Sequence, residues 1–261
     1  IMPITLLHPR FLLPIAPVNE VLPGVSVAFD QDGIISIAPR EELEKLYPAA
    51  SAISLDSHAL MPGLVNAHGH FAMTLLRGLG ESKSMERWLK EKIWPLEKRW
   101  VDEQFILDGA ELAIAEMIAS GTTCASDMYW FPDVVAQVAV NTGFRMQVAF
   151  PVIDHENAWA KSADECIHKG LTLLDKQRDQ DLIRVVFGPH SPLTVEPQTL
   201  NRIQILADEL DIGIQIHLHE TAEEVAAAHE RWGTSCIHHL HNLGLLTSNL
   251  QAVHMTQLDD E

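Results

Sequence analysis

Two histidines one residue apart, in the run MPGLVNAHGHF, are the residues whose types and spacing most clearly suggest chemistry. Pro62, Gly63 and Gly69 interrupt this run too closely for a helix, so we expect an extended segment. Side chains two apart on a strand point to the same side, and His68 and His70 can therefore reach one ion. Neutral imidazole nitrogens bind divalent transition metals at about 2.0–2.1 Å. The pair is therefore predicted to supply two metal ligands.

A third imidazole strengthens this interpretation. An isolated H-x-H motif is more often a turn cap beside a solvent-exposed ring, but His217 ends a later apolar run, IGIQIHLHE. We expect His217 to be the third metal ligand. His219 has the same parity, and because the strand is ending there, an outer position behind the ligands and a solvent-facing position both stay open.

A carboxylate follows three residues beyond the third ligand. Glu220 can lie beside metal-bound water and move protons, and the alternative is that it caps or begins the next helix, TAEEVAAAHE. His190 in GPHSP and His254 in AVHM end two other apolar runs. Each alone is explained equally well as a hydrogen-bonded core histidine. Together with the other histidines, they are predicted to polarise a substrate or orient the attacking water.

The elements that must position these residues are short apolar segments separated by stretches of helical period. We expect strands at 63–70, 122–128, 145–152, 183–190, 212–220 and 250–255. Such alternation is typical of a parallel sheet covered by helices, either an open doubly wound sheet or a β/α barrel. No G-x-G-x-x-G follows a strand, which disfavours a nucleotide-binding sheet. A barrel is favoured because the informative polar residues, Asp127 among them, fall at the C-terminal ends of strands, which converge on one rim.

Two of the intervening helices have clear boundaries. The first is predicted to be capped by Asp102 and stopped by Gly121, and the second to run from Thr194 through Pro197 to a stop before Gly213. The residues expected to face the core are Ile106, Ala110, Ala113, Ile114, Met117 and Ile118 in the first helix, and Leu200, Ile203, Ala207 and Leu210 in the second.

Residues 1–60 have a different residue pattern, with short β segments broken by Pro, Gly and Asp. We predict a small N-terminal β domain, sandwich-like, over residues 1–60, followed by the barrel domain over 61–261. Within the first domain, residues 29–35 are expected to form a hairpin with Asp32 and Gly33 in the turn. The apolar first twenty residues contain four prolines and no basic leader, so we expect strand and loop rather than a signal peptide.

The composition excludes several classes of partner. Eighteen Lys and Arg against 36 Asp and Glu give a net charge of −18, which would repel a phosphate backbone and disfavours nucleic acid. No apolar stretch approaches the ~20 residues that cross a membrane. Cys124, Cys166 and Cys236 are widely spaced without a C-x-x-C pair, as expected in a reducing cytoplasm. A small-molecule substrate is the expected partner, and a homo-oligomer stays open.

Taken in order, PGLVNAHGH, GPHSP, IHLHE and AVHM resemble the amidohydrolase superfamily over nearly the whole chain. The best match is its mononuclear deaminase branch, with 5-methylthioadenosine/S-adenosylhomocysteine deaminases and triazine chlorohydrolases. This implies hydrolysis of a C–N bond in a cyclic amidine, by metal-activated water that attacks a ring carbon and releases ammonia from an adenine-type amine. By the match, His68, His70 and His217 hold the metal, Glu220 moves protons, and His254 orients or helps to activate the water.

The sequence discriminates further within this superfamily. Binuclear members such as dihydroorotases carry a bridging lysine on the fourth strand, whereas IRVVFGPH has none, which favours one metal ion and disfavours a ring-opening amidase. Three imidazoles and a carboxylate suit Zn²⁺ first, with Fe²⁺ or Mn²⁺ also compatible. Cytidine-type zinc deaminases need H-x-E with P-C-x-x-C, and neither is present. A deaminase or chlorohydrolase of guanine, cytosine or a triazine, and a non-catalytic metal-binding remnant, remain alternatives.

The tryptophan-rich segment 77–100 follows the first barrel strand. It is equally well explained as a helix packed over the barrel mouth and as a substrate lid. The resemblance suggests a lid whose Glu97 takes the ribose hydroxyls of an adenosine. Trp88 and Trp94 would give apolar surface to a thioether tail, and His190 would contact the adenine or ribose.

The chain departs from the superfamily pattern at its end. The family has a fourth metal ligand, an aspartate at the end of the eighth strand, but this sequence stops soon after the sixth. Asp259 and Asp260 follow His254 too closely for that role and are interpreted as loop or helix cap. Six strands leave a barrel open with two unpaired edges. We therefore expect a (β/α)8 TIM-type barrel truncated after strand 6, and a chain that is part of a longer functional protein.

Overall fold

The structure, a computed structural model, describes residues 3–16, 19–79 and 85–258. By its internal contacts the chain divides into two compact units, Ile1–Gly63 and Leu64–Glu261. Each unit is described by itself. That residues 1–60 and 61–261 are separate, independently folding domains stays a prediction. Among the described residues, no helix is both long enough and apolar enough to cross a membrane.

In its described residues, the first unit is a five-stranded sheet with one helix. In it β2, β1, β3 and β4 are antiparallel neighbours in that order, and β5 pairs in parallel with β1. The elements are β1 (Thr5–Leu12), β2 (Leu22–Pro23), β3 (Val25–Asp30), β4 (Gly33–Pro39), α1 (Arg40–Leu46) and β5 (Ser51–Leu60). The predicted small β unit is present, and helix α1, absent from the prediction, takes the place of a second sheet.

The predicted hairpin forms between β3 and β4, with its turn one residue earlier than expected. Asp30 pairs with Gly33, so the two turn residues are Gln31 and Asp32. The backbone of Gly33 has a φ of 138°, a region open to glycine, at the first position of β4. A small core of Leu6, Ala28 and Leu43 joins the sheet to α1.

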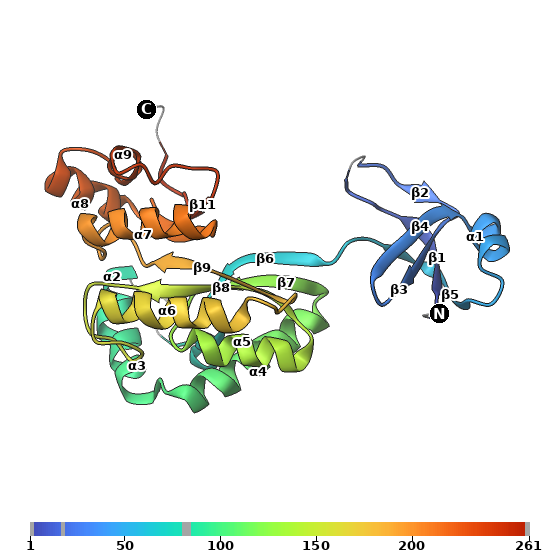
Figure 1. Ribbon diagram of the computed structural model, residues 1–261, viewed down its shortest axis with the longest axis horizontal. Helices are drawn as coiled ribbons and strands as arrows, with labels where there is room; N and C mark the ends of the chain where they lie inside the picture. Colours follow the sequence, from blue (N-terminus) through green and yellow to red (C-terminus); the bar gives the residue numbers. More distant parts are fainter. Residues whose placement is uncertain (1–2, 17–18, 80–84, 259–261) are drawn as a thin grey trace. The chain divides into compact units, whose positions relative to one another are not determined.

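The second unit is a parallel sheet of six strands in the order β6 to β11, surrounded by helices (Figure 1). The strands are β6 (Leu64–Gly69), β7 (Thr122–Asp127), β8 (Arg145–Val152), β9 (Ile183–Pro189), β10 (Ile214–Leu218) and β11 (Leu250–His254). All six predicted strands form. The predicted fold class, a small β unit followed in the chain by a partial β/α barrel, is confirmed. Figure 1 shows α4, α5 and α6 together on one side of the strands and α7, α8 and α9 on the other.

The helical elements of this unit connect successive strands. They are the 3₁₀ segment η1 (Phe71–Leu76), α2 (Met85–Trp88), the π-helical turn η2 (Leu89–Ile93), α3 (Trp94–Trp100), α4 (Glu103–Ala119), α5 (Pro132–Thr142), α6 (Ala163–Gln177), α7 (Pro197–Leu210), α8 (Ala222–Trp232) and α9 (Cys236–Asn242). Between β6 and β7 the described residues contain no strand, and this connection is the longest between two strands of the unit.

Side chains alternate along each strand, so that one face of the sheet packs against the helices and the other faces the inside of the barrel. On β8, Met146, Val148 and Phe150 join the large apolar core between sheet and helices, whereas Gln147 faces the inside of the barrel and bonds to side chains of other strands. The sheet is rolled, so the inside of the barrel is narrow. The amide of Gln251 on β11 donates to a carbonyl oxygen of β6, at 2.6 Å. The rolled sheet thus places an apolar layer outside and a polar layer inside.

Two residues predicted to face the core do not. Helix α4 begins as expected, with Asp102 accepting from the backbone N–H of Phe105 at 2.8 Å, but Ile118 is 55% exposed. It lies about 120° around the helix from the buried Ile106, at ~100° per residue, and so falls off the buried face. Leu210 at the end of α7 is 40% exposed for the same reason, about 80° from Leu200.

Helix α7 begins later than predicted. It starts at Pro197, after Glu196 as N-cap, because the side chain of Thr194 is used elsewhere: its hydroxyl bonds to the ring of His190. The helix ends at Leu210, before an Asp211 with a φ of 51°. The residues between the strand end and Pro197 therefore form a loop beside the histidines and not a first helical turn.

We predict that Gly109→Ala destabilises the protein. A Cβ at Gly109 of α4 would lie 2.6 Å from the Cα of Ala72 in η1, and backbone cannot move aside as a flexible side chain can. Overpacking should lower the free energy of unfolding by about 1–3 kcal/mol, against the ~1 kcal/mol that alanine gains over glycine in a helix. Urea unfolding followed by circular dichroism measures the change. Leu112→Ala, at an exposed position on the same helix, is the control, and a Gly109→Ala variant as stable as wild type would contradict the predicted contact.

Candidate metal centre and active site

Three histidines from separate strands meet at the C-terminal end of the barrel. His68 is the next-to-last residue of β6, His217 lies in β10 and His254 ends β11. Each offers a ring nitrogen such that the three atoms lie within 4.8 Å of one another. The closest approach joins Nε2 of His68 to Nε2 of His217, at 3.1 Å. This group, which we call the histidine cluster, could hold a metal ion.

His70 lies against the same cluster. Its ring centroid is 4.8 Å from that of His68 and 5.3 Å from that of His217. The sequence assigned His70 to the metal and His254 to the water, whereas the tightest group of ligand atoms contains His254. Both rings adjoin the site, and the division of roles between them stays a prediction.

Backbone carbonyls fix the tautomer of two of these rings. The Nδ1 atom of His217 lies 2.7 Å from the carbonyl oxygen of His190, and Nδ1 of His70 lies 2.6 Å from that of Met128. A carbonyl oxygen only accepts, so each Nδ1 must donate its hydrogen. The Nε2 atom then carries a lone pair, the arrangement in which a histidine binds metal while its other nitrogen holds an outer partner.

The imidazoles are neutral at physiological pH, as metal binding requires. Burial lowers the pKa of His68 to about 4 and that of His217 to about 2, because a charged ring loses its hydration. Burial also lowers the pKa of His70 and of His254. No proton therefore has to be displaced from these rings at neutral pH.

The geometry fits a small divalent cation. Two imidazole nitrogens bound tetrahedrally at 2.0–2.1 Å are separated by about 3.3 Å, close to the 3.1 Å between the two Nε2 atoms. The lone pair on Nε2 of His217 is directed at Nε2 of His68. A cation between the two nitrogens would be bound by both and would remove the repulsion between them. The donor set of imidazole nitrogens suits Zn²⁺ and other transition metals.

Glu220 lies beside the cluster and pairs with His254. One of its carboxylate oxygens is 3.3 Å from Nε2 of His254. Helix α8 begins only at Ala222, with Thr221 as its N-cap, so the alternative in which Glu220 caps or begins the helix is wrong. Burial, with a smaller contribution from the negative charge of Glu224, raises the pKa of Glu220 to about 7. A carboxyl group with such a pKa can both accept and return a proton near neutrality.

His219 takes the outer position. It is buried, its Nδ1 lies 2.6 Å from the carbonyl oxygen of Gln257, and its Nε2 accepts from the backbone N–H of Ile237. Its own carbonyl oxygen accepts the N–H groups of Thr256 and Gln257. His254 has a φ of 78°, so the chain turns sharply there and returns to His219. His219 thereby ties the ends of β10 and β11 together behind the cluster.

His190 and Glu97 border the cluster through different contacts. The ring of His190 lies 5.2 Å from that of His217, and its Nδ1 meets the hydroxyl of Thr194 at 2.9 Å. Glu97 on α3 accepts a hydrogen bond of 2.6 Å from the hydroxyl of Tyr129, whose ring centroid is 6.0 Å from that of His70. Burial raises the pKa of Glu97, and hydrogen bonds from Tyr129 and Trp130 oppose that rise.

The two predicted tryptophans are placed on the segment that also carries Glu97. Trp88 donates to the carbonyl oxygen of Leu79 at 3.0 Å, and Trp94 is 50% exposed. Their contact with a substrate stays a prediction. Asp259 and Asp260, predicted to lie in a loop or to cap a helix, fall outside the described residues.

Two positions near the site, Tyr129 and Gln215, were not selected from the sequence, and Asp127 was noted only as a polar residue at a strand end. Tyr129 holds Glu97, Gln215 contacts His68, and Asp127 accepts the backbone N–H of Phe71 at 2.6 Å, which fixes the chain just after His70. Strand parity was a usable signal for Gln215, because it lies two residues before His217. Neither of the other two contacts has a local signature, since the partners are more than thirty residues apart.

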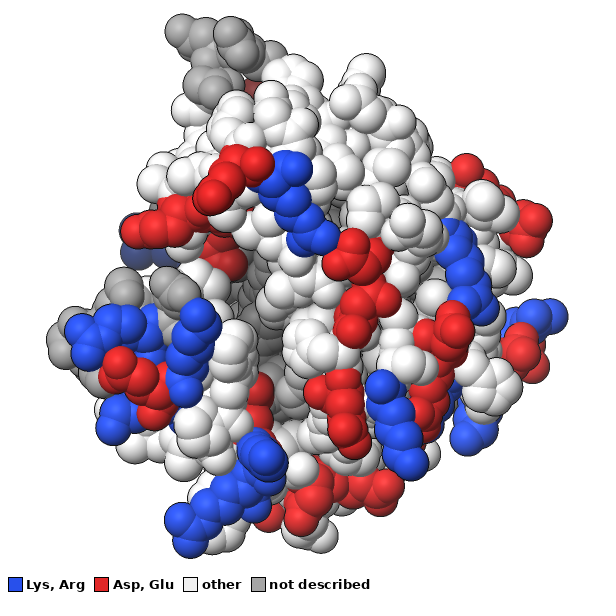
Figure 2. Space-filling model, turned by 90° about the vertical axis from the view of Figure 1, so that its left-hand side faces the viewer, with Lys and Arg blue, Asp and Glu red and all other residues white. Residues whose placement is uncertain are grey.

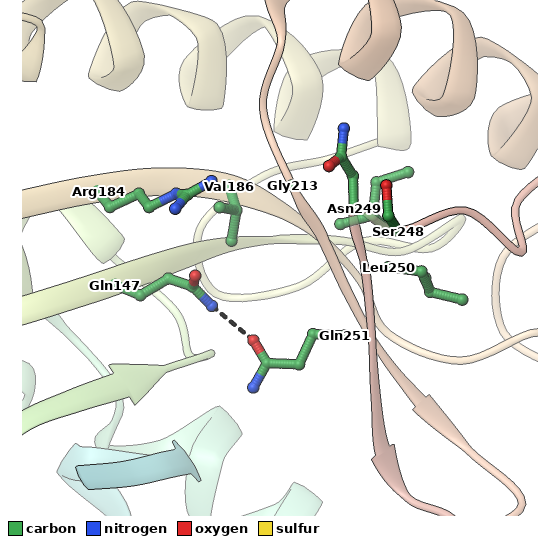
Figure 3. A pocket seen from close by; sticks show the side chains of 9 residues that line it. Gln147, Arg184, Val186, Gly213, Ser248, Asn249, Leu250 and Gln251 are labelled. Carbon is green, nitrogen blue, oxygen red and sulfur yellow. Dashed lines mark hydrogen bonds between the residues drawn. The ribbon is translucent and has the colours of Figure 1, made fainter. Parts of the chain in front are cut away.

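The end of the barrel that holds the histidines is open to solvent. Figure 2 views the side toward which β8 and β9 point in Figure 1, and shows a hollow near the middle of this face, bordered by acidic and basic side chains. A separate pocket lies at the opposite end, against the starts of β10 and β11, where Gly213, Asn249 and Gln251 are among its lining residues (Figure 3).

A comparison with protein families shows which family the chain belongs to. The model of the amidohydrolase family matches residues 59–261, which include the histidine cluster and Glu220. The chain belongs to the amidohydrolase family. This amidohydrolase is similar to 5-methylthioadenosine/S-adenosylhomocysteine deaminases of Saccharophagus degradans (44% identity over 97% of the chain) and Teredinibacter turnerae (46% over 98%).

The same relationship holds in three dimensions. The amidohydrolase chain superposes on the crystal structure of an adenosine deaminase from Xanthomonas campestris with bound zinc, with a TM-score of 0.95, 41% identity and 98% of the chain covered. The chain spans 56% and 58% of the lengths of the two curated relatives, and 58% of that crystallised chain.

We predict that His68→Ala and His217→Ala each weaken Zn²⁺ binding by more than about 100-fold. Loss of an outer partner weakens binding by up to that amount, and each of these variants removes a nitrogen that binds the ion itself. Competition with a chromogenic chelator measures the dissociation constant. His229→Ala, at an exposed position on α8, is the control and should bind as wild type does. Unchanged Zn²⁺ affinity in His217→Ala would rule out the cluster as the metal centre.

Proposed function

We propose that this protein is a metal-dependent hydrolytic deaminase of adenosine-type thioethers, 5′-methylthioadenosine and S-adenosylhomocysteine. The observation that carries the proposal is the Glu220–His254 pair beside the histidine cluster, at the open end of the barrel. A carboxylate with this partner and this neighbourhood is suited to moving protons during attack by water. The identity of 44% and 46% with two deaminases of this name supports the choice of substrate.

The cofactor we propose is one divalent ion, Zn²⁺ first, held by His68, His70 and His217. When bound, such an ion would polarise a water molecule and supply a nucleophile at neutral pH. In support, the Nδ1 atoms of His70 and His217 donate to carbonyl oxygens, so their Nε2 lone pairs are free. A crystal structure that is 41% identical to this chain contains zinc.

The proposed reaction exchanges an exocyclic amine for an oxygen. Glu220 takes a proton from the attacking water and delivers it to the ring nitrogen next to the attacked carbon. His254, 3.3 Å from Glu220, orients that water and stabilises the charge on Glu220 while the oxygen–carbon bond forms. The carbon–nitrogen bond then breaks, ammonia leaves with the second water proton, and a ring carbonyl remains.

Binding of the nucleoside is proposed to use the segment after β6 and the loop after β9. Glu97, held through one oxygen by Tyr129, would accept hydrogen bonds from ribose hydroxyls with its other oxygen. His190, fixed by Thr194, would contact the purine or ribose, and Trp88 and Trp94 would cover the thioether tail. A cytoplasmic location fits this metabolic role and the three free cysteines.

The first test is ammonia release by the protein expressed from its complete reading frame, on 5′-methylthioadenosine, S-adenosylhomocysteine, adenosine, guanine, cytosine and a chlorotriazine. We expect the two thioethers to give the highest kcat/KM, a chelator to abolish turnover, and Zn²⁺ to restore it. A preference for guanine, cytosine or the triazine would replace the proposed substrate, and no turnover with bound Zn²⁺ would favour a non-catalytic metal-binding protein.

In the same assay Glu220→Gln should lower kcat by about 10²–10⁴-fold, the usual range for loss of a general acid–base group, with Zn²⁺ content unchanged. Glu223→Gln is the matched control, because Glu223 is an exposed carboxylate three residues further along the chain. A Glu220→Gln enzyme with wild-type kcat would remove Glu220 from the chemistry.

A separate prediction concerns the ribose. Glu97→Gln should raise KM for adenosine nucleosides about 10- to 100-fold with little change in kcat, since a hydrogen bond to a charged group contributes about 1.5–3 kcal/mol. For 2′,3′-dideoxy analogues the variant and wild type should have similar KM values. Glu103→Gln, exposed on α4, is the control. An equal rise in KM for dideoxy and ribose substrates would show that Glu97 does not contact the hydroxyls.

A further inference from the structure

A layer of polar side chains lies inside the barrel, one step below the histidine cluster. It contains Ser126 of β7, Gln147 of β8, Gln215 of β10 and Gln251 of β11, and we call it the glutamine layer. Gln215 is fully buried and precedes His217 by two residues, so both side chains point into the barrel. Buried amides this close to a candidate metal centre call for a physical reason, because each must find partners.

The hydrogen bonds of Gln215 fix which way its amide points. Its nitrogen lies 3.3 Å from the carbonyl oxygen of Ala67 and 2.9 Å from the hydroxyl oxygen of Ser126. The Ala67 oxygen only accepts, so the atom that faces it must be the NH₂ group. The side-chain oxygen of Gln215 is thereby directed at Nδ1 of His68, at 3.4 Å.

The carbonyl oxygen of Ala67 prevents the amide of Gln215 from turning over. Gln251 donates to the same Ala67 oxygen at 2.6 Å, and Gln147 donates to Gln251 at 2.8 Å, the bond drawn in Figure 3. Gln147 also donates to the hydroxyl of Ser126 at 3.0 Å. If Gln215 flipped, its oxygen would face the Ala67 carbonyl oxygen, two acceptors without a hydrogen between them in a buried site.

We propose that Gln215 is a positioning residue that holds His68 in the tautomer needed to bind metal. Its oxygen accepts from Nδ1 of His68, so the hydrogen stays on Nδ1 and the Nε2 lone pair faces His217. His68 is then the counterpart of His70 and His217, whose Nδ1 atoms donate to backbone carbonyls. This inference rests on the proposed metal centre and deepens it, because it names a group beyond the ligands that sets metal affinity.

The competing explanation is that the glutamine layer only fills the barrel. Gln147 allows the two explanations to be separated: it belongs to the same layer and makes two hydrogen bonds there, to Ser126 and Gln251. Neither of these partners is a histidine. Replacing either glutamine with methionine removes an amide from the layer and keeps a similar shape, but only Gln215→Met removes the oxygen that faces His68.

The experiment measures Zn²⁺ affinity by chelator competition for wild type, Gln215→Met and Gln147→Met, with unfolding of the metal-free proteins recorded in parallel. We expect the dissociation constant of Gln215→Met to rise 10- to 100-fold, the usual effect of losing an outer partner, and that of Gln147→Met to stay within about threefold of wild type. Equal weakening in both variants, or none in Gln215→Met, would overturn the proposal.

A second measurement needs neither a variant of Gln215 nor bound metal. In metal-free wild-type protein labelled with ¹⁵N-histidine, a long-range ¹H–¹⁵N spectrum reports which ring nitrogen of His68 carries hydrogen, with the signal assigned by its loss in His68→Ala. We expect the Nδ1–H form, and an Nε2–H form would overturn the role of Gln215. Failure of wild type to bind Zn²⁺ would count against the proposed function, whereas the tautomer of His68 tests Gln215 in either case.

Discussion

The site depends on one constraint: buried, neutral imidazoles must keep their Nε2 atoms close together. Two of these atoms lie 3.1 Å apart, a separation that is favourable around a cation and unfavourable between lone pairs alone. The rings therefore cannot be held by attraction for each other. They are held from behind, by acceptors that engage each Nδ1: the carbonyl oxygens of His190 and Met128, and the amide oxygen of Gln215. The surrounding fold can be understood as the means of holding these acceptors in place.

The rolled parallel sheet holds the acceptors in place because its two faces make different contacts. The outward side chains, such as Phe150 and Phe187 with ring centroids 4.8 Å apart, pack against the helices and make the sheet rigid. The inward side chains are stacked in levels, with the glutamine layer below and the histidines above. Because Gln251 of the last strand reaches the carbonyl oxygen of Ala67 on the first, the roll of the sheet is itself fixed by hydrogen bonds next to the site.

The strand ends add the groups that the strands cannot supply. Left-handed backbone at His219, with a φ of 52°, and at His254, with a φ of 78°, bends the chain at the barrel rim. Such conformations are costly for residues other than glycine, and the hydrogen bonds from His219 to the 256–257 loop compensate for that cost. The same bends place Glu220 and His254 side by side. Strained backbone, an outer histidine and the Glu220–His254 pair are thus parts of one arrangement.

The sequence by itself determined the order and type of the six barrel strands, the barrel fold, and the strand ends at which His68, His70 and His217 lie. These features follow from the succession of short apolar segments and helical stretches along the chain, and from the polar residues that end those segments. Only the tertiary structure decided that His219 faces away from the cluster, that Gln215 faces His68, and that Tyr129 holds Glu97. Each of these outcomes depends on how far the sheet rolls and which distant strands become neighbours. Such contacts join residues far apart in the chain, so no local pattern of residue types can encode them.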